Sequence, residues 1–225
     1  MKEEKFHHLE THFNKLKSMI SDMIENVRKA LVNAVHSFEE KDIEMAREVI
    51  NNDYIVDNLQ RKIEKEIVGY VGRFQPLAED LRYAITMIKL ATDLERIGDL
   101  ASDIAEITVK YDHNYELESQ EKLKKMTAIV ENMVEDALTA YYKRDIELAI
   151  EVWKRDDVVD NLYDDVKEHS IKILKVTNNE YKEEHVFDQI IVARYLERAA
   201  DHATNIAEEV YYIVLGKNLK EEMEN

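Results

Sequence analysis

Carboxylate side chains recur at helical intervals in two thirteen-residue segments of this chain. Residues 94–106 read LERIGDLASDIAE and residues 196–208 read LERAADHATNIAE, so eight of the thirteen positions are identical. In the first segment Glu95 and Asp99 stand four residues apart, and the second segment repeats that spacing. Four residues turn an α-helix by about 400°, which places both acids of a pair on one face. Each segment therefore presents paired carboxylates, groups that bind metal cations through oxygen.

A second kind of acidic pair precedes each of these segments. Asp53 and Asp57 are four residues apart, and Asp156 and Asp160 are spaced in the same way. Neighbouring helices in a bundle lie about 8–10 Å apart, so four carboxylates from two adjacent helices can converge on one site. The pattern predicts one such site in each half of the chain. The candidate metal ligands are Asp53, Asp57, Glu95, Asp99, Asp103, Asp156, Asp160, Glu197 and Asp201.

Two interpretations of these acidic faces stay open. Oxygen ligands without thiolate favour Mg, Mn, Ca or iron, and bridging carboxylates can hold a multinuclear cluster. The alternative is a solvated surface, on which Arg96 and Arg198 neutralise neighbouring acids. His36 and His202 are interpreted as packed or surface side chains rather than as ligands. His202 directly follows Asp201 and is expected to point about 100° away from it.

The acidic pairs belong to a longer internal repeat. Residues 42–59 read DIEMAREVINNDYIVDNL and residues 145–162 read DIELAIEVWKRDDVVDNL, which match at eleven of eighteen positions. A duplicated unit of about 100 residues is too long for a solenoid repeat. We predict that each unit holds three amphipathic helices packed up-down-up. The expected fold is all-α, with two tandem three-helix bundles, six long helices and a pseudo-twofold internal repeat.

Apolar residues at steps of three and four set the expected helix boundaries. Asp42 is expected to cap the second helix. Gly69, Gly72 and Pro76 are expected to end it and start the third, and Gly216 to stop the sixth. The tail after this stop is polar and is expected to fray. The expected helices cover about residues 3–40, 43–74, 77–111, 119–143, 146–176 and 181–215; the units are residues 1–112 and 118–216 with a boundary at 112–116, followed by the polar tail 217–225.

The composition narrows the functional classes. A formal net charge of -17 repels nucleic acid and anionic lipid, and it attracts cations or basic partner surfaces. No run of about 18 apolar residues is present that would span a membrane. The charged N-terminus lacks the apolar core of a signal peptide, so we expect a cytoplasmic protein. The chain has no Cys, which excludes disulfides and thiolate sites. No phosphate-binding Gly-rich loop or catalytic triad is recognisable, and enzymatic activity is not expected.

The tandem units, their D-x-x-x-D pairs and their L-E-R-x-x-D-H-A-x-N-I-A-E segments resemble the PhoU family of phosphate-uptake regulators. The resemblance extends from about Phe6 to Gly216. The second acidic segment matches the family pattern well. The first departs from it at Leu100, where the family has His, and at Asp103, where the family has Asn. Asp103 adds a potential ligand, so the two sites need not bind equal numbers of metal ions.

The resemblance implies a cytoplasmic negative regulator of phosphate uptake and of the phosphate-starvation response. Such proteins couple a membrane phosphate ABC transporter to a sensor histidine kinase, and they often self-associate, which implies a homodimer or higher oligomer. Some members hold multinuclear iron at their acid pairs, and Zn, Ni, Mn and Mg remain alternatives here. Two other functions stay open: a carboxylate-based metal storage protein, and a metal-free helical scaffold.

Overall fold

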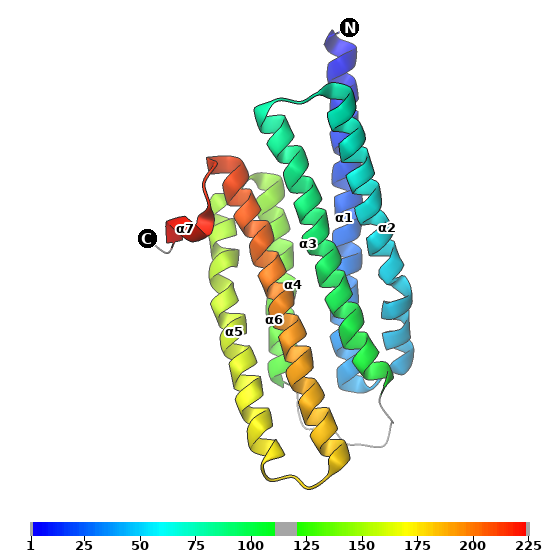
Figure 1. Cartoon of the computed structure of the whole chain (residues 1–225), viewed down its shortest axis with the longest axis vertical. Helices are drawn as coiled ribbons and strands as arrows, with labels where there is room; N and C mark the ends of the chain where they lie inside the picture. Colours follow the sequence, from blue (N-terminus) through cyan, green and yellow to red (C-terminus); the bar gives the residue numbers. More distant parts are fainter. Residues whose placement is uncertain (1, 111–120, 224–225) are drawn as a thin grey trace.

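The regular structure is entirely helical in a computed structural model that describes residues 2–110 and 121–223 (Figure 1). The prediction of an all-α fold with two tandem three-helix units is confirmed. The boundary expected at residues 112–116 lies outside the described residues. The helices are α1 (Lys2–Glu40), α2 (Ile43–Phe74), α3 (Ala78–Val109), α4 (Glu121–Lys143), α5 (Ile146–Leu174), α6 (Glu180–Leu215) and the short α7 (Leu219–Met223).

The turn between the first two helices is built in the same way in both units. Lys41 and Arg144 adopt left-handed backbone conformations, with φ of 57° and 54°. The Asp42 side chain then accepts a hydrogen bond from the Met45 backbone N–H at 2.9 Å, and Asp145 caps α5 in the same manner at 3.1 Å. A capping aspartate stabilises a helix by about 1 kcal/mol. The cap predicted at Asp42 is confirmed, and the repeat extends to its turns.

Gly69 and Gly72 lie inside α2, so the prediction that they end this helix is wrong. The helix ends at Phe74, and its C-cap residue Gln75 has a left-handed φ of 48° and donates its backbone N–H to a helical carbonyl at 3.0 Å. An interior glycine costs about 1 kcal/mol relative to alanine. Burial of the neighbouring Ile67 and Tyr70 offsets that cost and keeps the last turns helical.

The expected fraying of the C-terminal tail is wrong for residues 219–223. This segment forms α7, which packs against α6. Leu219 is fully buried, and Lys217 pairs with Glu222 at 2.9 Å. The buried Leu219 and this ion pair together hold the segment against the bundle.

The two acidic segments lie on the helices that join the two units. α3 and α6 pack against each other at the centre of the molecule, and α1 contacts α4 beside them (Figure 1). Leu94 and Ile97 of α3, and Leu196 and Ala199 of α6, are all buried in one hydrophobic core that both units share. The acids occupy the other faces of these helices, where α2 and α5 run alongside.

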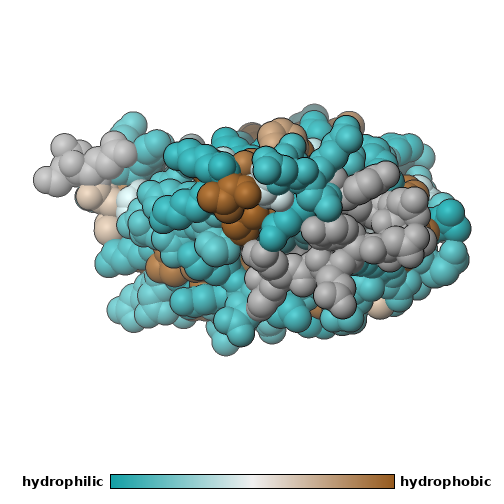
Figure 2. All heavy atoms as spheres, turned by 90° about the horizontal axis from the view of Figure 1, so that it is seen from below, coloured by the Kyte–Doolittle hydropathy of each residue, from teal (hydrophilic) through white to brown (hydrophobic). Residues whose placement is uncertain are grey.

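The surface follows from this use of the apolar faces. Figure 2 shows the end of the bundle at the α5–α6 turn, where hydrophilic residues cover most of the visible surface and hydrophobic residues form a small patch. Amphipathic helices that bury their apolar faces in a shared core leave a mostly hydrophilic surface. Among the described helices, none is both long and apolar enough to cross a membrane.

Candidate metal centres

The first acidic cluster consists of Asp53 and Asp57 on α2 with Glu95 and Asp99 on α3. One carboxylate oxygen from each of Asp53, Asp57 and Asp99 lies within 4.8 Å of the other two, and all three residues are half-buried. Carboxylates on neighbouring helices approach this closely because each pair shares one helix face. Such a group of oxygens matches the ligand set of a divalent cation.

Glu95 completes the first cluster from a more buried position. Its side chain is 17% exposed, and its Oε2 has no hydrogen bond among the described residues. Burial raises the pKa of Glu95, and the negative charges of Asp99, Asp57 and Asp53 raise it further, while Arg96 opposes the rise. Burial is also the main cause of the raised pKa of Asp53. Arg96 Nε lies 3.5 Å from Glu95 Oε2, so its charge offsets part of the rise in the pKa of Glu95.

Asp103 lies beside this cluster, nearer to the second unit. Burial raises the pKa of Asp103, as do the charges of Glu106 and Asp99, and Arg198 of α6 opposes the rise. The structure therefore brings Asp103 to the junction of α3 and α6. It does not include Asp103 among the three carboxylates that converge within 4.8 Å.

Gly98 allows α2 and α3 to approach each other at the first cluster. A Cβ atom added at Gly98 would stand 3.3 Å from Cγ1 of Val56, a tight contact in which the Val56 side chain would have to move by a few tenths of an ångström. Val56 lies between Asp53 and Asp57 in the sequence. The second unit has Ala200 at the corresponding position.

The second acidic cluster consists of Asp156 and Asp160 on α5 with Glu197 and Asp201 on α6. Burial raises the pKa of Asp156 to about 6, with further contributions from the charges of Asp201 and Asp160. Glu197 is only 9% exposed, and burial followed by the charge of Asp201 raises its pKa. Asp156 Oδ1 and Glu197 Oε2 are buried without a hydrogen bond among the described residues. Among the described residues, ligand atoms of three side chains converge within 4.8 Å in the first cluster and not in this one.

The second cluster opens onto a cavity of about 440 Å³ between α5, α6 and α7. The space is large enough for more than one metal ion with its water ligands. Its lining offers several oxygen donors and one imidazole. The lining residues are Trp153, Asp156, Asp157, Arg198, Asp201, His202, Thr204, Asn205, Glu208 and Lys220.

His202 lines this cavity together with Asp201, although the two are neighbours in the sequence. Its Nδ1 lies 3.0 Å from Oδ1 of Asp93 on α3. The expectation that His202 points away from the acidic face agrees with this contact, because His202 reaches α3 while Asp201 acts on Asp156 of α5. The expectation that His36 lies at the surface agrees with its exposed position.

Two hydroxyl groups contribute to the clusters and were not among the sequence-based candidates. Hydrogen bonding by Ser102 opposes the rise in the pKa of Asp53, and Thr204 acts in the same way on Asp156. Both stand at the same position of the repeated acidic segment. The repeated hydroxyl side chain at this position was the feature of the sequence that could have identified both residues.

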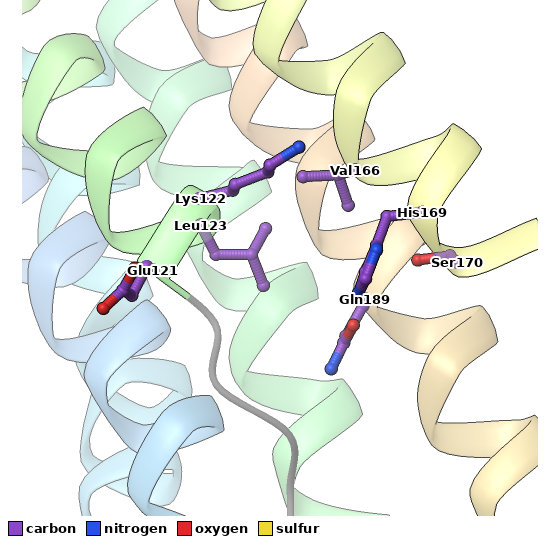
Figure 3. A pocket seen from close by; sticks show the side chains of 7 residues that line it. All are labelled: Glu121, Lys122, Leu123, Val166, His169, Ser170 and Gln189. Atoms are coloured by element: carbon purple, nitrogen blue, oxygen red, sulfur yellow. The ribbon is translucent and has the colours of Figure 1, made fainter. Parts of the chain in front are cut away.

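A separate cavity of about 210 Å³ lies where α4, α5 and α6 meet (Figure 3). Figure 3 shows Ser170, His169 and Gln189 gathered on one side and Leu123 facing them. Among its lining residues only Glu121 carries a carboxylate. This cavity lacks the repeated acids and does not resemble the two acidic clusters.

The chain matches one family model twice. Residues 20–108 and residues 123–210 each match the model described as PhoU domain. A Thermotoga maritima protein named phosphate-specific transport system accessory protein PhoU homolog 1 is 37% identical over 215 residues, covering 95% of this chain and 92% of that protein. A Clostridium acetobutylicum homologue with the same description, without the number, is 33% identical and covers 93% of this chain and 95% of that protein.

Solved structures show the same architecture. The crystal structure of PhoU from Pseudomonas aeruginosa matches with a TM-score of 0.86 at 31% identity, covering 92% of this chain and 99% of that one. A phosphate transport system regulatory protein PhoU from Streptococcus pneumoniae matches with a TM-score of 0.83 at 25% identity, covering 93% and 98%. The likeness extends over both units.

Proposed function

Since the chain belongs to the PhoU family, we propose that it is a regulatory accessory protein of a phosphate transport system that acts by binding rather than by catalysis. The names of its relatives support the link to phosphate transport. The finer role follows the family resemblance. In the cytoplasm the protein acts as an adaptor between a phosphate ABC transporter and a sensor histidine kinase, and it restrains uptake and the starvation response. It does so as a homodimer or a higher oligomer.

We propose that the two acidic clusters bind metal, and one observation carries this part. Buried oxygens of Glu95, Asp156 and Glu197 have no hydrogen bond among the described residues, although an unsatisfied buried polar group costs about 1–3 kcal/mol. A transition-metal ion, including multinuclear iron, would supply the missing charge and ligand bonds. Bound metal would then fix the spacing of α2 against α3 and of α5 against α6, and so present a rigid surface to a partner.

The alternative of metal storage is favoured by the 440 Å³ cavity, because its many oxygen donors suit several ions. The two functions differ in stoichiometry and reversibility. A storage protein binds many ions per chain and releases them without any effect on a partner. An adaptor binds a fixed small number, and its partner affinity changes when the metal is removed.

The test is elemental analysis of untagged protein before and after chelator treatment, with melting temperature and light scattering on both samples. Metal at a hundredfold excess over its Kd stabilises the fold by about 2.7 kcal/mol, or roughly 5–10 °C for a chain of this size. The double variant Asp99→Asn/Asp201→Asn is expected to lose the metal, this stabilisation and binding to the purified transporter complex.

The matched control is Asp22→Asn/Glu168→Gln, which makes the same charge change at two exposed positions. It is expected to retain metal and partner binding. If the cluster variant keeps its full metal content, the clusters are not metal centres. If it loses metal and still binds the transporter with unchanged affinity, metal has no part in the adaptor role.

A further inference from the structure

The C-terminal helix α7 has one buried side chain. Leu219 is fully buried, whereas Lys220, Glu222 and Met223 of the same helix are exposed. Helices shorter than about 12–15 residues are marginal alone in water, so this short helix depends on the contact that Leu219 makes. As the described residues define it, the hydrophobic core that the two units share does not include Leu219. Release of α7 would therefore leave that core intact.

The chain reverses its direction between α6 and α7. Gly216 has a left-handed φ of 68°, which glycine adopts without strain, and it donates its backbone N–H to the carbonyl of Tyr212 at 2.8 Å. The Asn218 side chain accepts a hydrogen bond from the backbone N–H of Glu221 at 3.4 Å. Figure 1 shows α7 folded back from the end of α6 toward α5. A short exposed turn thus joins α7 to the bundle.

Lys220 of α7 contributes positive charge to the cavity of the second acidic cluster. The carboxylates that line this cavity are Asp156, Asp157, Asp201 and Glu208, and the lining cations are Lys220 and Arg198. Arg198 also acts on Asp103 of the first unit. Without α7, four lining carboxylates would face one lining cation. A cavity with this charge attracts a positively charged group to the place of Lys220.

Trp153 provides the same cavity with an aromatic wall. This tryptophan of α5 is half-buried, and tryptophan is the aromatic side chain that binds cations best through the face of its ring. The site therefore combines a buried position for Leu219 with carboxylates and an indole around Lys220. Such a combination fits a segment in which an apolar residue precedes a lysine or an arginine, and α7 is a segment of this kind.

We propose that α7 is an autoinhibitory segment, which covers a docking site on α5 and α6 for a partner segment with an apolar residue followed by a basic one. The inference rests on the proposed function, because the partner belongs to the phosphate transport system, and it does not depend on bound metal. The second family match ends at residue 210, so α7 lies beyond the matched part of the chain. The partner segment displaces α7 and places its own cation where Lys220 now lies.

The fluorescence of Trp153, the single tryptophan of the chain, reports whether α7 covers the cavity. Leu219→Ser removes the apolar anchor and is expected to raise acrylamide quenching of Trp153 to the level of a variant that lacks residues 217–225. Met223→Ser makes a similar change at an exposed position of α7 and is expected to match the parent. Equal quenching in the parent and the shortened variant would show that α7 does not cover the cavity, and would overturn the inference.

Binding to the purified transporter complex tests the autoinhibition itself. Leu219→Ser and the variant without residues 217–225 are each expected to bind about tenfold more tightly than the parent, the factor for a parent whose open state is about one tenth populated. Met223→Ser is expected to bind as the parent does. All four proteins are measured in one buffer with the same metal content.

The charge of the partner segment is tested in the Leu219→Ser background. Adding Asp157→Asn and Glu208→Gln removes two lining carboxylates that are not among the proposed metal ligands. This addition is expected to reverse the gain in affinity, because the incoming cation then meets less negative charge. Asp22→Asn with Glu168→Gln, the same charge change at exposed positions, is the matched control and is expected to retain the gain.

The outcomes separate this inference from the proposed function. If neither the parent nor any variant binds the transporter complex, the proposed function is wrong and the inference fails with it. If the parent binds and Leu219→Ser binds with equal or lower affinity, the proposed function stands and the autoinhibition is overturned. If light scattering shows a dimeric parent that becomes monomeric without residues 217–225, α7 docks on a second copy of the chain, which also overturns the inference.

Discussion

The two acidic clusters share their carboxylates but differ in the charges placed beside them. In the first, Arg61 pairs with Asp57 at 2.7 Å and Arg96 pairs with Asp99 at 2.9 Å. In the second, Asp164 stands where the repeat has Arg61, and its negative charge contributes to the raised pKa of the neighbouring aspartate at position 160. The first unit thus has a positive side chain at this position of the repeat, and the second unit has a negative one.

The second arginine has also changed its role. Arg198 corresponds to Arg96 in the repeated segment, yet it acts on Asp103 of the first unit and opposes the rise in its pKa. Arg194 pairs with Glu197 of the second cluster. The duplication kept the carboxylates of each cluster and altered the charged side chains that pair with them.

The largest expected effect is a difference in Mn²⁺ affinity between two single substitutions, one in each cluster. Asp201→Asn is expected to weaken the tightest class of Mn²⁺ sites about 100-fold, or by about 2.7 kcal/mol, because the second cluster is the less compensated one. Asp99→Asn is expected to leave that class intact and to weaken only the second class of sites. Calorimetric titration of both variants measures this. Equal effects of the two substitutions on one class would contradict the asymmetry.

Reversing the charge at Arg61 and at Asp164 tests whether these residues cause the difference between the two clusters. Asp164→Arg places a cation beside the second cluster and is expected to reduce its Mn²⁺ affinity about tenfold. Arg61→Asp is expected to raise the affinity of the first cluster by a similar factor, since charges a few ångströms apart near a surface interact by about 1 kcal/mol or more. Salt should diminish both effects. Affinity changes of the same sign in the two variants would rule out this explanation.

The pH dependence of the metal-free protein is expected to reflect Asp156. Its folded pKa is raised to about 6, above the unfolded value of about 3.9, so the native state binds the proton more tightly. Stability is therefore highest below pH 4 for this group and falls as pH rises through about 6. Asp156→Asn is expected to stabilise the metal-free protein at pH 7 by about 1 kcal/mol after allowance for solvent screening, or about 2–4 °C.

Thermal unfolding at pH 5 and pH 7 measures this difference. The expected gain from Asp156→Asn is smaller at pH 5, where the parent carboxyl is already largely protonated. Saturating metal should reverse the order at pH 7, because the variant lacks a ligand. A gain that does not depend on pH would show that the carboxylate charge is not its origin.

The smallest expected effect concerns the helix spacing at the first centre. Gly98→Ala introduces a Cβ 3.3 Å from Val56 Cγ1, which pushes α2 and α3 apart by a few tenths of an ångström. Its better helix propensity of about 1 kcal/mol offsets the crowding, so the melting temperature changes little. Mn²⁺ affinity of the first centre is expected to fall a few-fold. A change at the second centre, which already has Ala200, would contradict the local origin of the effect.

The sequence by itself determined the helices, their pairing into two units and the spacing of the acid pairs. These features depend on local periodicity and on caps such as Asp42 and Asp145, which act within a few residues of themselves. The positions of Asp53, Asp57, Glu95 and Asp99 on shared helix faces follow from the same periodicity. The interior glycines of α2 and the docking of Leu219 were misjudged, because burial against another helix outweighs a local preference.

Only the tertiary structure decided which side chains meet between the two units. The contact of His202 with Asp93 spans 109 positions in the chain, and the proximity of Arg198 to Asp103 depends equally on how α3 packs against α6. Periodicity places a residue on a face of its own helix but does not fix the rotation and register of a second helix against it. The charges and hydrogen-bond donors around each acidic cluster are therefore a property of the packed bundle.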